Sequence, residues 1–230
     1  MSHFSPATTG FLRGLAANNN REWFLAHRAE YESEVKAPLT ALVEALALAF
    51  AAHDIPMTGS GKTSLFRINR DLRFAADKSP YKTNAGAILS RDGTRKARGI
   101  LYIHITPMDG LMAMGFYSPE PSDLHSLRQA MLADPRAWAG IEAGLARAGH
   151  ALSREEALAR LPKGFDPPPD RADLAEALKL RHLVIRQPLT LEAMYEPALV
   201  ERILAFAPVG LPLLEWGWRA LHGVRPPARG

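Results

Sequence analysis

The sequence predicts an α+β protein, with a central antiparallel sheet of about four strands, N-terminal helices and a mostly helical C-terminal half. Apolar residues recur every three or four positions in the first third and again in the last half of the chain, which is the period of a helix. Between these parts, apolar and polar residues alternate, as is typical of half-buried strands. The connections between these strands are too short for the crossover helices that parallel pairing requires, so we expect antiparallel pairing.

Length and composition favour one domain. The 230 residues are 47% hydrophobic, and we find neither a repeat nor a linker, so we expect a single domain over 1–230, folded from about 8 to 222 and ending in a disordered tail, 223–230. There is no cysteine, which excludes a disulfide framework, a thiolate metal site and a cysteine nucleophile. The N-terminus has no signal-peptide pattern, and the longest apolar run, 45–52, is shorter than the roughly 20 residues of a membrane span. We therefore expect a cytoplasmic protein without membrane contact.

The N-terminal third is predicted to be helical. Asn19 and Glu22 have the spacing of a capping box, and an apolar stripe follows them. Pro38 lies inside this stripe and has no amide hydrogen, so we expect a kink there, or a second helix that starts near it. Ile55-Pro56 ends the helical part. The stripe comprises Phe24, His27, Tyr31, Val35, Leu39, Leu42, Leu46 and Phe50.

Four segments are expected to form the sheet: 65–74, 85–90, 100–106 and 111–117. In the first, LFRINRDLRF, the even positions Phe66, Ile68, Leu72 and Phe74 would face one side and the charged positions the other. Asp92-Gly93 suits the tip of a hairpin between the second and third segments. In the third segment, Tyr102 and His104 should face away from the core.

The C-terminal half is expected to be helical over 122–134, 135–149, 153–161 and 191–207, with Ser122 and Ser153 as N-caps. The stretch PKGFDPPPD, 162–170, reads as a proline-rich loop. Trp216 and Trp218 lie in an apolar segment and are expected to pack in the core.

The stretch GSGKTS, 59–64, resembles a phosphate-binding loop but departs from it. That motif needs a glycine at the position of Pro56, and it lies between a strand and a helix, whereas here a helix precedes and a strand is expected to follow. We interpret it as a glycine-rich connection.

The positive charge of the protein is concentrated in one segment. Residues 62–98 contain ten basic and three acidic residues, a net charge of +7, although the whole chain has only +4. Arginine forks bind carboxylates or phosphates in bidentate fashion, so several of them on one face make a candidate anion site. We expect a ligand-binding site of Arg67, Arg70, Asp71, Arg73, Asp77, Lys78, Tyr81, Lys82 and His104, the last being the least secure member.

Several motifs resemble one known family. NNNREWF (18–24), RINRDLRFAADKSPYKTN (67–84), a YIHI strand, GFYSPEP (115–121) and LPKGFD (161–166) are similar to the DUF2461 family of bacterial and fungal proteins of unknown function. The resemblance covers roughly residues 10–215. It implies no activity; it implies only that Arg70, Asp71, Arg73, Phe74, Asp77, Lys78, Pro80, Tyr81 and Lys82 occupy signature positions of that family.

Three functions stay open at this point. The first is binding of a phosphate-bearing small molecule or nucleic acid. The second is an enzyme in which Asp71 or Asp77 acts as a base and the cations stabilise negative charge. The third is a structural or protein-interaction domain in which Arg70-Asp71 and Asp77-Lys78 form ion pairs that only stabilise the fold. The eight histidines show no metal-ligand spacing and no Gly-x-Ser-x-Gly elbow exists, so we expect neither a metal nor another cofactor.

Overall fold

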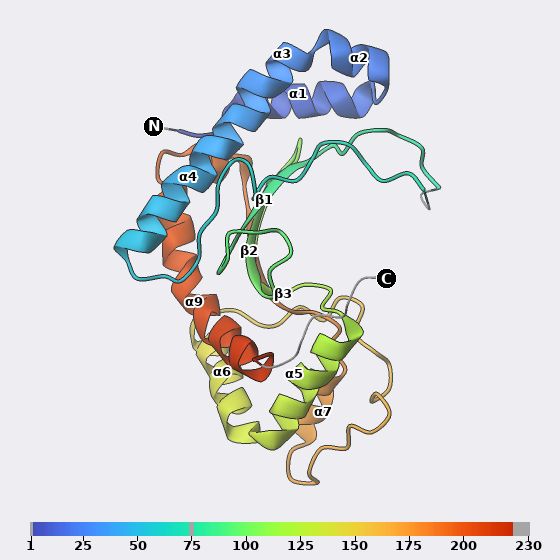
Figure 1. The fold of residues 1–230 in the computed structure, drawn as a ribbon, viewed down its shortest axis with the longest axis vertical. Helices are drawn as coiled ribbons and strands as arrows, with labels where there is room; N and C mark the ends of the chain where they lie inside the picture. Colours follow the sequence, from blue (N-terminus) through green and yellow to red (C-terminus); the bar gives the residue numbers. More distant parts are fainter. Residues whose placement is uncertain (1, 74–75, 223–230) are drawn as a thin grey trace. The chain divides into compact units, whose positions relative to one another are not determined.

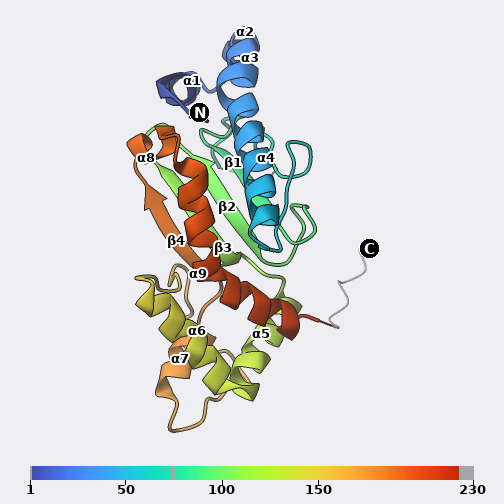
Figure 2. The same cartoon turned by 90° about the vertical axis from the view of Figure 1, so that its left-hand side faces the viewer.

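The computed structural model describes residues 2–73 and 76–222, and these residues divide into two compact units. The first unit comprises residues 1–97, 101–113 and 187–207; the second comprises 98–100, 114–186 and 208–230. Figures 1 and 2 show the elements of both. The predicted tail, 223–230, lies outside the described residues.

The sheet has four strands in the order β1-β2-β3-β4: β1 (Ala85–Ser90), β2 (Ile100–Ile105), β3 (Gly110–Phe116) and β4 (Leu183–Leu189). It is antiparallel, so the predicted α+β class and strand number are confirmed. Three of its strands match the predicted segments. The fourth does not, because β4 lies in a region for which the pattern gave no strand.

The prediction of a strand over residues 65–74 is wrong. Over residues 65–73, the part that the structure describes, this segment forms only isolated bridges, at Leu65 with Ala87 and at Asn69 with Tyr81. Its first part follows β1, and residues 68–70 then pair with 80–82, so the chain turns back on itself as an irregular hairpin. Figure 1 draws it as a long two-armed loop leading away from β1. Phe66, expected on a buried face, has 38% of its surface exposed.

The helices of the first unit lie at the N-terminus. They are α1 (Pro6–Ala17), α2 (Arg21–Ala26), α3 (Arg28–Glu30), a π-helical stretch η1 (Tyr31–Lys36) and α4 (Ala37–Ala52), with the short α8 (Leu191–Tyr195) later in the chain. α1 packs on η1, and α4 packs on β1. The fully buried side chains include Leu42, Leu46 and Phe50 of α4 and Ile88, Leu101 and Ile103 of the sheet.

Pro38 stands at the first turn of α4, as one of the two predicted alternatives has it. The turn before it is widened: the N–H of Ala37 bonds to the carbonyl of Glu32, five residues back. A proline cannot donate to the preceding turn, and a π turn directly before it lets the helical run continue without a break.

The second unit contains α5 (Pro121–Ala133), α6 (Pro135–Arg147) and α7 (Ala172–Leu178), while α9 (Leu199–Ala220) crosses from the first unit into the second at Pro208. Its core includes Trp138, whose ring lies 4.9 Å from that of Trp216. The core role expected of Trp216 is thus confirmed, and Trp218 donates its indole N–H to the carbonyl of Arg98 at 2.7 Å.

Two expectations for the C-terminal half are wrong. Residues 153–161 form no helix: the N–H of Ser153 bonds to Val184 of β4, and the N–H of Leu158 bonds to Lys179. Glu120, not Ser122, is the N-cap of α5, because Pro121 takes the first helical position. The segment 191–207 is helical but is divided between α8 and α9.

The helical run Arg28–Ala52 is long and apolar enough to cross a membrane by length and composition. The sequence has no uninterrupted apolar stretch that would reveal this helical run, because the run includes the charged residues of η1. A core helix of a soluble protein meets the same criterion; here Leu39, Leu42, Val43 and Leu46 are buried, but only 33% of the apolar window is. The cytoplasmic location therefore stays a prediction.

Candidate functional site

The irregular hairpin of the first unit carries most of the predicted site residues. It is closed by two backbone bonds, from Arg70 N–H to Pro80 and from Lys82 N–H to Ile68, at 2.9 and 2.8 Å. Arg70 and Asp77 therefore face each other across the hairpin although they are seven residues apart. They form an ion pair between the arginine Nη1 and the carboxylate Oδ2.

Asp77 also organises the turn of the hairpin. Its other oxygen, Oδ1, accepts from the N–H and the hydroxyl of Ser79, at 2.8 and 2.7 Å. These two bonds, together with the Arg70 guanidinium, hold the pKa of Asp77 well below its ordinary value. The carboxylate is thus fully engaged with hydrogen-bond donors.

Asp71 forms the second ion pair. Its carboxylate accepts from Nε and Nη2 of Arg73, at 3.0 and 2.7 Å, and from the Arg73 N–H, and these contacts lower its pKa to about 2. The expected pairs Arg70-Asp71 and Asp77-Lys78 do not form: Lys78 instead donates to the carbonyl of Leu72 at 3.1 Å. The observed pairs are exposed, with 46% of the Asp71 and 61% of the Asp77 side chain accessible.

Asn19 fixes the second arm of the hairpin. Its amide group donates to the carbonyl of Tyr81 at 2.9 Å and accepts from the N–H of Tyr81 at 3.0 Å. The expected capping role belongs to its neighbour Asn20, which accepts from the N–H of Trp23. The Tyr81 ring is buried and stacks on Phe24 with a centroid separation of 4.2 Å, so this predicted site residue is a core residue.

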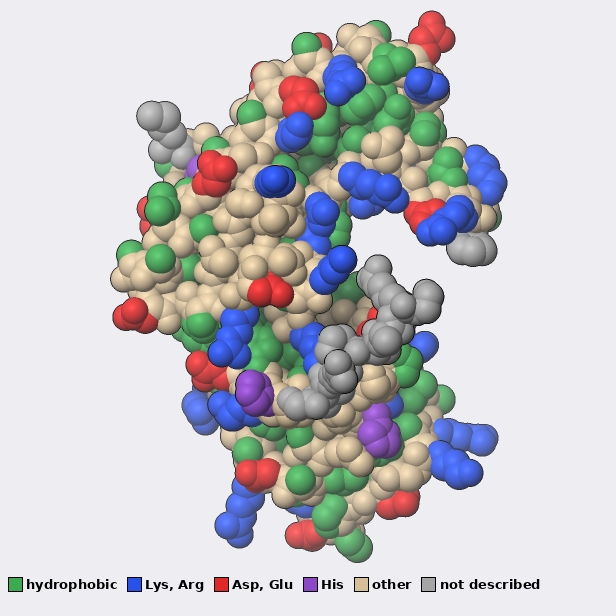
Figure 3. Space-filling model, in the orientation of Figure 1, with side chains coloured by type: hydrophobic (Ala, Val, Ile, Leu, Met, Phe, Trp, Pro, Cys, Tyr) green, Lys and Arg blue, Asp and Glu red, His purple; other side chains and the backbone are tan. Residues whose placement is uncertain are grey.

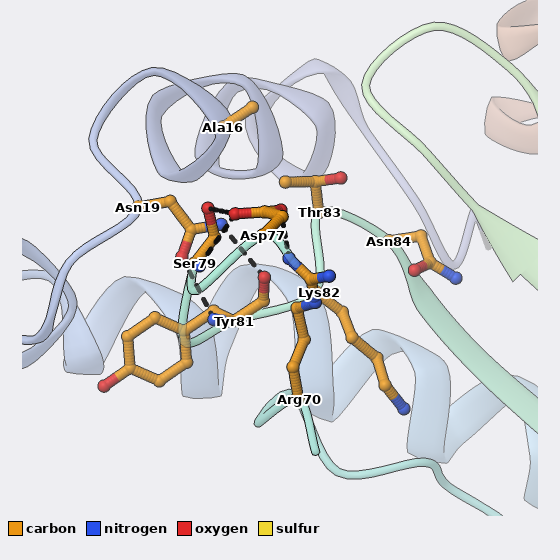
Figure 4. Close-up of a pocket in the computed structure, with 9 residues that line it drawn as sticks. All are labelled: Ala16, Asn19, Arg70, Asp77, Ser79, Tyr81, Lys82, Thr83 and Asn84. Atoms are coloured by element: carbon orange, nitrogen blue, oxygen red, sulfur yellow. Dashed lines mark hydrogen bonds and ion pairs between the residues drawn. The ribbon is translucent and has the colours of Figure 1, made fainter. Parts of the chain in front are cut away.

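A hollow of about 390 Å³ lies between α1 and the hairpin. Figure 4 shows Arg70 and Asp77 pointing toward one another in it, while the Tyr81 ring points away from them and Lys82 extends to the other side. Of the predicted site residues the hollow brings together four, namely Arg70, Asp77, Tyr81 and Lys82. The rest of its lining is Ala16, Asn19, Ser79, Thr83 and Asn84.

Three further cations of the first unit, which we call the basic cluster, surround Phe66: Arg67, Lys82 and Arg95. Arg67 follows Phe66 in the chain, the Lys82 ammonium lies 5.2 Å from the centre of its ring, and Arg95 donates to the backbone carbonyl of the residue before Phe66. Burial, with the positive charges of Arg67 and Arg95, lowers the pKa of Lys82. Among the described residues no carboxylate forms an ion pair with any of the three, although the charge of Arg67 helps to lower the pKa of Asp71. Figure 3 shows basic side chains gathered on the face where Figure 1 draws the hairpin.

An aromatic row adjoins the basic cluster: Phe66, Tyr102 and His104. The Lys82 ammonium lies 5.2 Å from the centre of the Phe66 ring, and that ring meets Tyr102 edge-on at 6.0 Å. The Tyr102 hydroxyl lies 3.0 Å from Nδ1 of His104. The rings of Phe66 and Tyr102 thus lie between Lys82 and His104.

Seven of the nine predicted site residues therefore fall into two groups, while Tyr81 is a core residue and His104 belongs to the aromatic row. Arg70, Asp71, Arg73, Asp77 and Lys78 hold the hairpin together through bonds to one another and to its backbone, whereas Arg67 and Lys82 belong to the basic cluster. The sequence did not indicate that Arg95 belongs to the basic cluster or that Phe66 belongs to the aromatic row beside it. Arg95 follows the Asp92-Gly93 turn, where Gly93 has a φ of +70°, and this turn was the available signal that the chain returns toward β1.

The GSGKTS stretch is a turn between α4 and the hairpin, as expected. A Cβ on Gly59 would lie 2.4 Å from the Ser64 hydroxyl, and one on Gly61 2.5 Å from the Thr40 side chain. Its glycines are explained by close packing.

Comparison with known proteins gives one match. The model of a family described as "Conserved hypothetical protein (DUF2461)" matches residues 7–216. No curated protein matches the chain.

Proposed function

Because the chain belongs to the DUF2461 family, whose description names no activity, we propose from the geometry of the site that the protein binds a phosphate-bearing anion at the basic cluster. The observation that carries the proposal is the grouping of Arg67, Lys82 and Arg95 without a paired carboxylate among the described residues. Burial is the main cause of the lowered pKa of Lys82, and the neighbouring charges of Arg67 and Arg95 lower it further, because like charges held together disfavour one another. An anion bound among them would relieve that repulsion.

The contrast with the other charges of the hairpin supports this assignment. Arg70 and Arg73 each have an aspartate partner, so their charge is already balanced locally. The structural alternative expects these pairs to be buried or half-buried. The Arg70 side chain is half-buried, whereas Asp77, Asp71 and Arg73 are exposed, and exposed pairs contribute little to stability.

The enzyme alternative has less support. A general base works best when its pKa is near the operating pH. Asp71 and Asp77 instead have lowered pKa values, because each accepts from an arginine and from backbone or hydroxyl donors. Both therefore make weak proton acceptors, and we propose binding without assigning a reaction.

Isothermal titration with inorganic pyrophosphate and with ribose 5-phosphate, at low and high salt, tests the proposal. We expect binding that weakens with salt and that falls at least tenfold in Lys82→Ala and in Arg67→Ala. Lys62→Ala is the matched control, since it removes the same charge from an exposed position in the same basic segment. Equal losses in all three variants would show general charge attraction and would refute a defined site, as would no binding by the wild type.

A further inference from the structure

The aromatic row next to the basic cluster points to the chemical class of the ligand. Phe66 is one of the few large apolar side chains of the described residues with more than a third of its surface exposed, and it lies in the most basic segment of the chain. Its N–H bonds to the carbonyl of Gly86 at 3.0 Å, so its backbone is fixed to β1. The exposure of its ring therefore does not come from a detached loop.

The sheet is shaped to hold the second ring. A Cβ on Gly86 would lie 3.0 Å from the Tyr102 hydroxyl and 3.1 Å from its ring, a separation tighter than ordinary contact. The absence of a side chain at Gly86 thus leaves the space that Tyr102 occupies on β1. Tyr102 in turn meets both Phe66 and His104 edge-on, at 6.0 and 5.3 Å.

We infer that the ligand is a nucleotide unit, whose base stacks on Phe66 while its phosphate binds Arg67, Lys82 and Arg95; this rests on the function proposed above. A phosphate alone would contact only the cations, whereas a nucleotide can also contact the exposed Phe66 ring, over which the Lys82 ammonium lies. A nucleobase has an aromatic face that stacks on such a ring, and proteins that bind single strands combine stacking rings with a basic groove in the same way. The shared chemistry is a base with a phosphate, in a free nucleotide or in a single strand.

The position of the Lys82 ammonium suits contact with both the base and the phosphate of a nucleotide. It lies over the Phe66 ring, where a cation is attracted by the π electrons, and it belongs to the basic cluster. It therefore marks the border at which the phosphate and the base of one nucleotide would meet.

The test compares ligands that share one half of a nucleotide. Adenosine 5′-monophosphate, ribose 5-phosphate, adenosine and a 12-residue thymidine oligonucleotide, single-stranded and as a duplex with its complement, are titrated against the full chain. We expect the monophosphate to bind at least about fivefold more tightly than ribose 5-phosphate, since loss of one base–ring stack weakens binding by about that factor or more. A single strand that binds more tightly than the monophosphate identifies nucleic acid as the source; equal affinity identifies free nucleotide.

Variants at residue 66 separate the two halves. Phe66→Leu keeps the apolar volume but has no aromatic face, so it should remove the advantage of the monophosphate and leave the affinity for ribose 5-phosphate within twofold. Phe66→Tyr should retain the advantage, and so should Met108→Ala, which removes another exposed apolar side chain of the first unit. Unchanged unfolding midpoints verify that the variants fold.

Two results would overturn this inference, and they differ from each other. If wild type binds the monophosphate and ribose 5-phosphate equally, or if Phe66→Leu weakens both equally, the base makes no contact with the ring, while the phosphate site stands. If no phosphate-bearing compound binds, the proposed function fails together with the inference.

Discussion

Replacing Asn19 with alanine tests how the hairpin is held. The Asn19 amide satisfies both backbone groups of Tyr81, and neither group has another backbone partner outside helices and strands. Each such hydrogen bond contributes about 1 kcal/mol net, so we expect Asn19→Ala to lower the free energy of unfolding by about 2 kcal/mol. For a chain of this length that corresponds to a melting point about 4 to 8 °C lower.

The assay is urea unfolding followed by circular dichroism, combined with thermal melts. Asn18→Ala is the matched control, because Asn18 makes a single exposed bond to the carbonyl of Gly14. It should cost less than about 1 kcal/mol. Asn19→Asp keeps the acceptor for the Tyr81 N–H but loses the donor to its carbonyl, so it should not restore stability.

The reasoning would be refuted by an Asn19→Ala variant within about 0.5 kcal/mol of wild type, or by equal effects at positions 18 and 19. Water would then replace the amide group without cost, and the stacking of Tyr81 on Phe24 would hold the second arm to the N-terminal helices without help from Asn19.

Three other predictions concern separate parts of the chain. Gly115→Ala should lower the free energy of unfolding in urea by about 3 kcal/mol or more, because Gly115 has a φ of +141° and an added Cβ would lie 2.0 Å from the Leu183 carbonyl. Gly140→Ala is the control, since a Cβ there would meet open space and should not destabilise the protein. A small loss of stability in Gly115→Ala would contradict this close packing. The pKa of Asp71 is about 2 in the folded protein, below its ordinary value of 3.8, so the Asp71 carboxylate stabilises the fold above about pH 4 and this stabilisation is lost as the pH falls toward 2. The difference in melting point between wild type and Asp71→Asn should therefore shrink from about pH 4 to about pH 2 and stay constant above about pH 4. The lowered pKa of Lys82 means that affinity for pyrophosphate should decline at a less alkaline pH in wild type than in Lys82→Arg; coincident profiles would show that Lys82 does not contact the anion.

Three strands could be predicted because their side chains alternate or form short buried runs bounded by turns. β4 was missed because its sequence, LVIRQPL, begins apolar but then has Arg186, Gln187 and Pro188 in succession, which obscures the period. For the segment 65–74 the error is the opposite one, because a strand was predicted where the described residues form none. Its alternation is real, but of the described members of its expected apolar face, Phe66, Ile68 and Leu72, only Ile68 is buried, and the chain reverses before a ladder forms. Phe74 lies outside the described residues.

The charge of the site could be predicted, but its pairing could not. Sequence proximity suggested Arg70 with Asp71, yet the hairpin brings Arg70 to Asp77 and leaves Asp71 for Arg73. Which residues meet depends on backbone bonds between residues 68–70 and 80–82, which no local pattern specifies. The contact between Asn19 and Tyr81 spans 62 residues and depends on how α1 and the hairpin pack.

The π turn at η1 determines in which direction the side chains of the N-terminal helices point. Because η1 holds an additional residue in its turn, the side chains before it and after it are offset from those of a regular α-helix by about 100°, the rotation of one residue. Deleting one residue within Tyr31–Lys36 would allow a regular helix. It would also turn Phe24 and its neighbours away from Tyr81, so the irregular helix keeps α1 and α2 in register with the hairpin that they support.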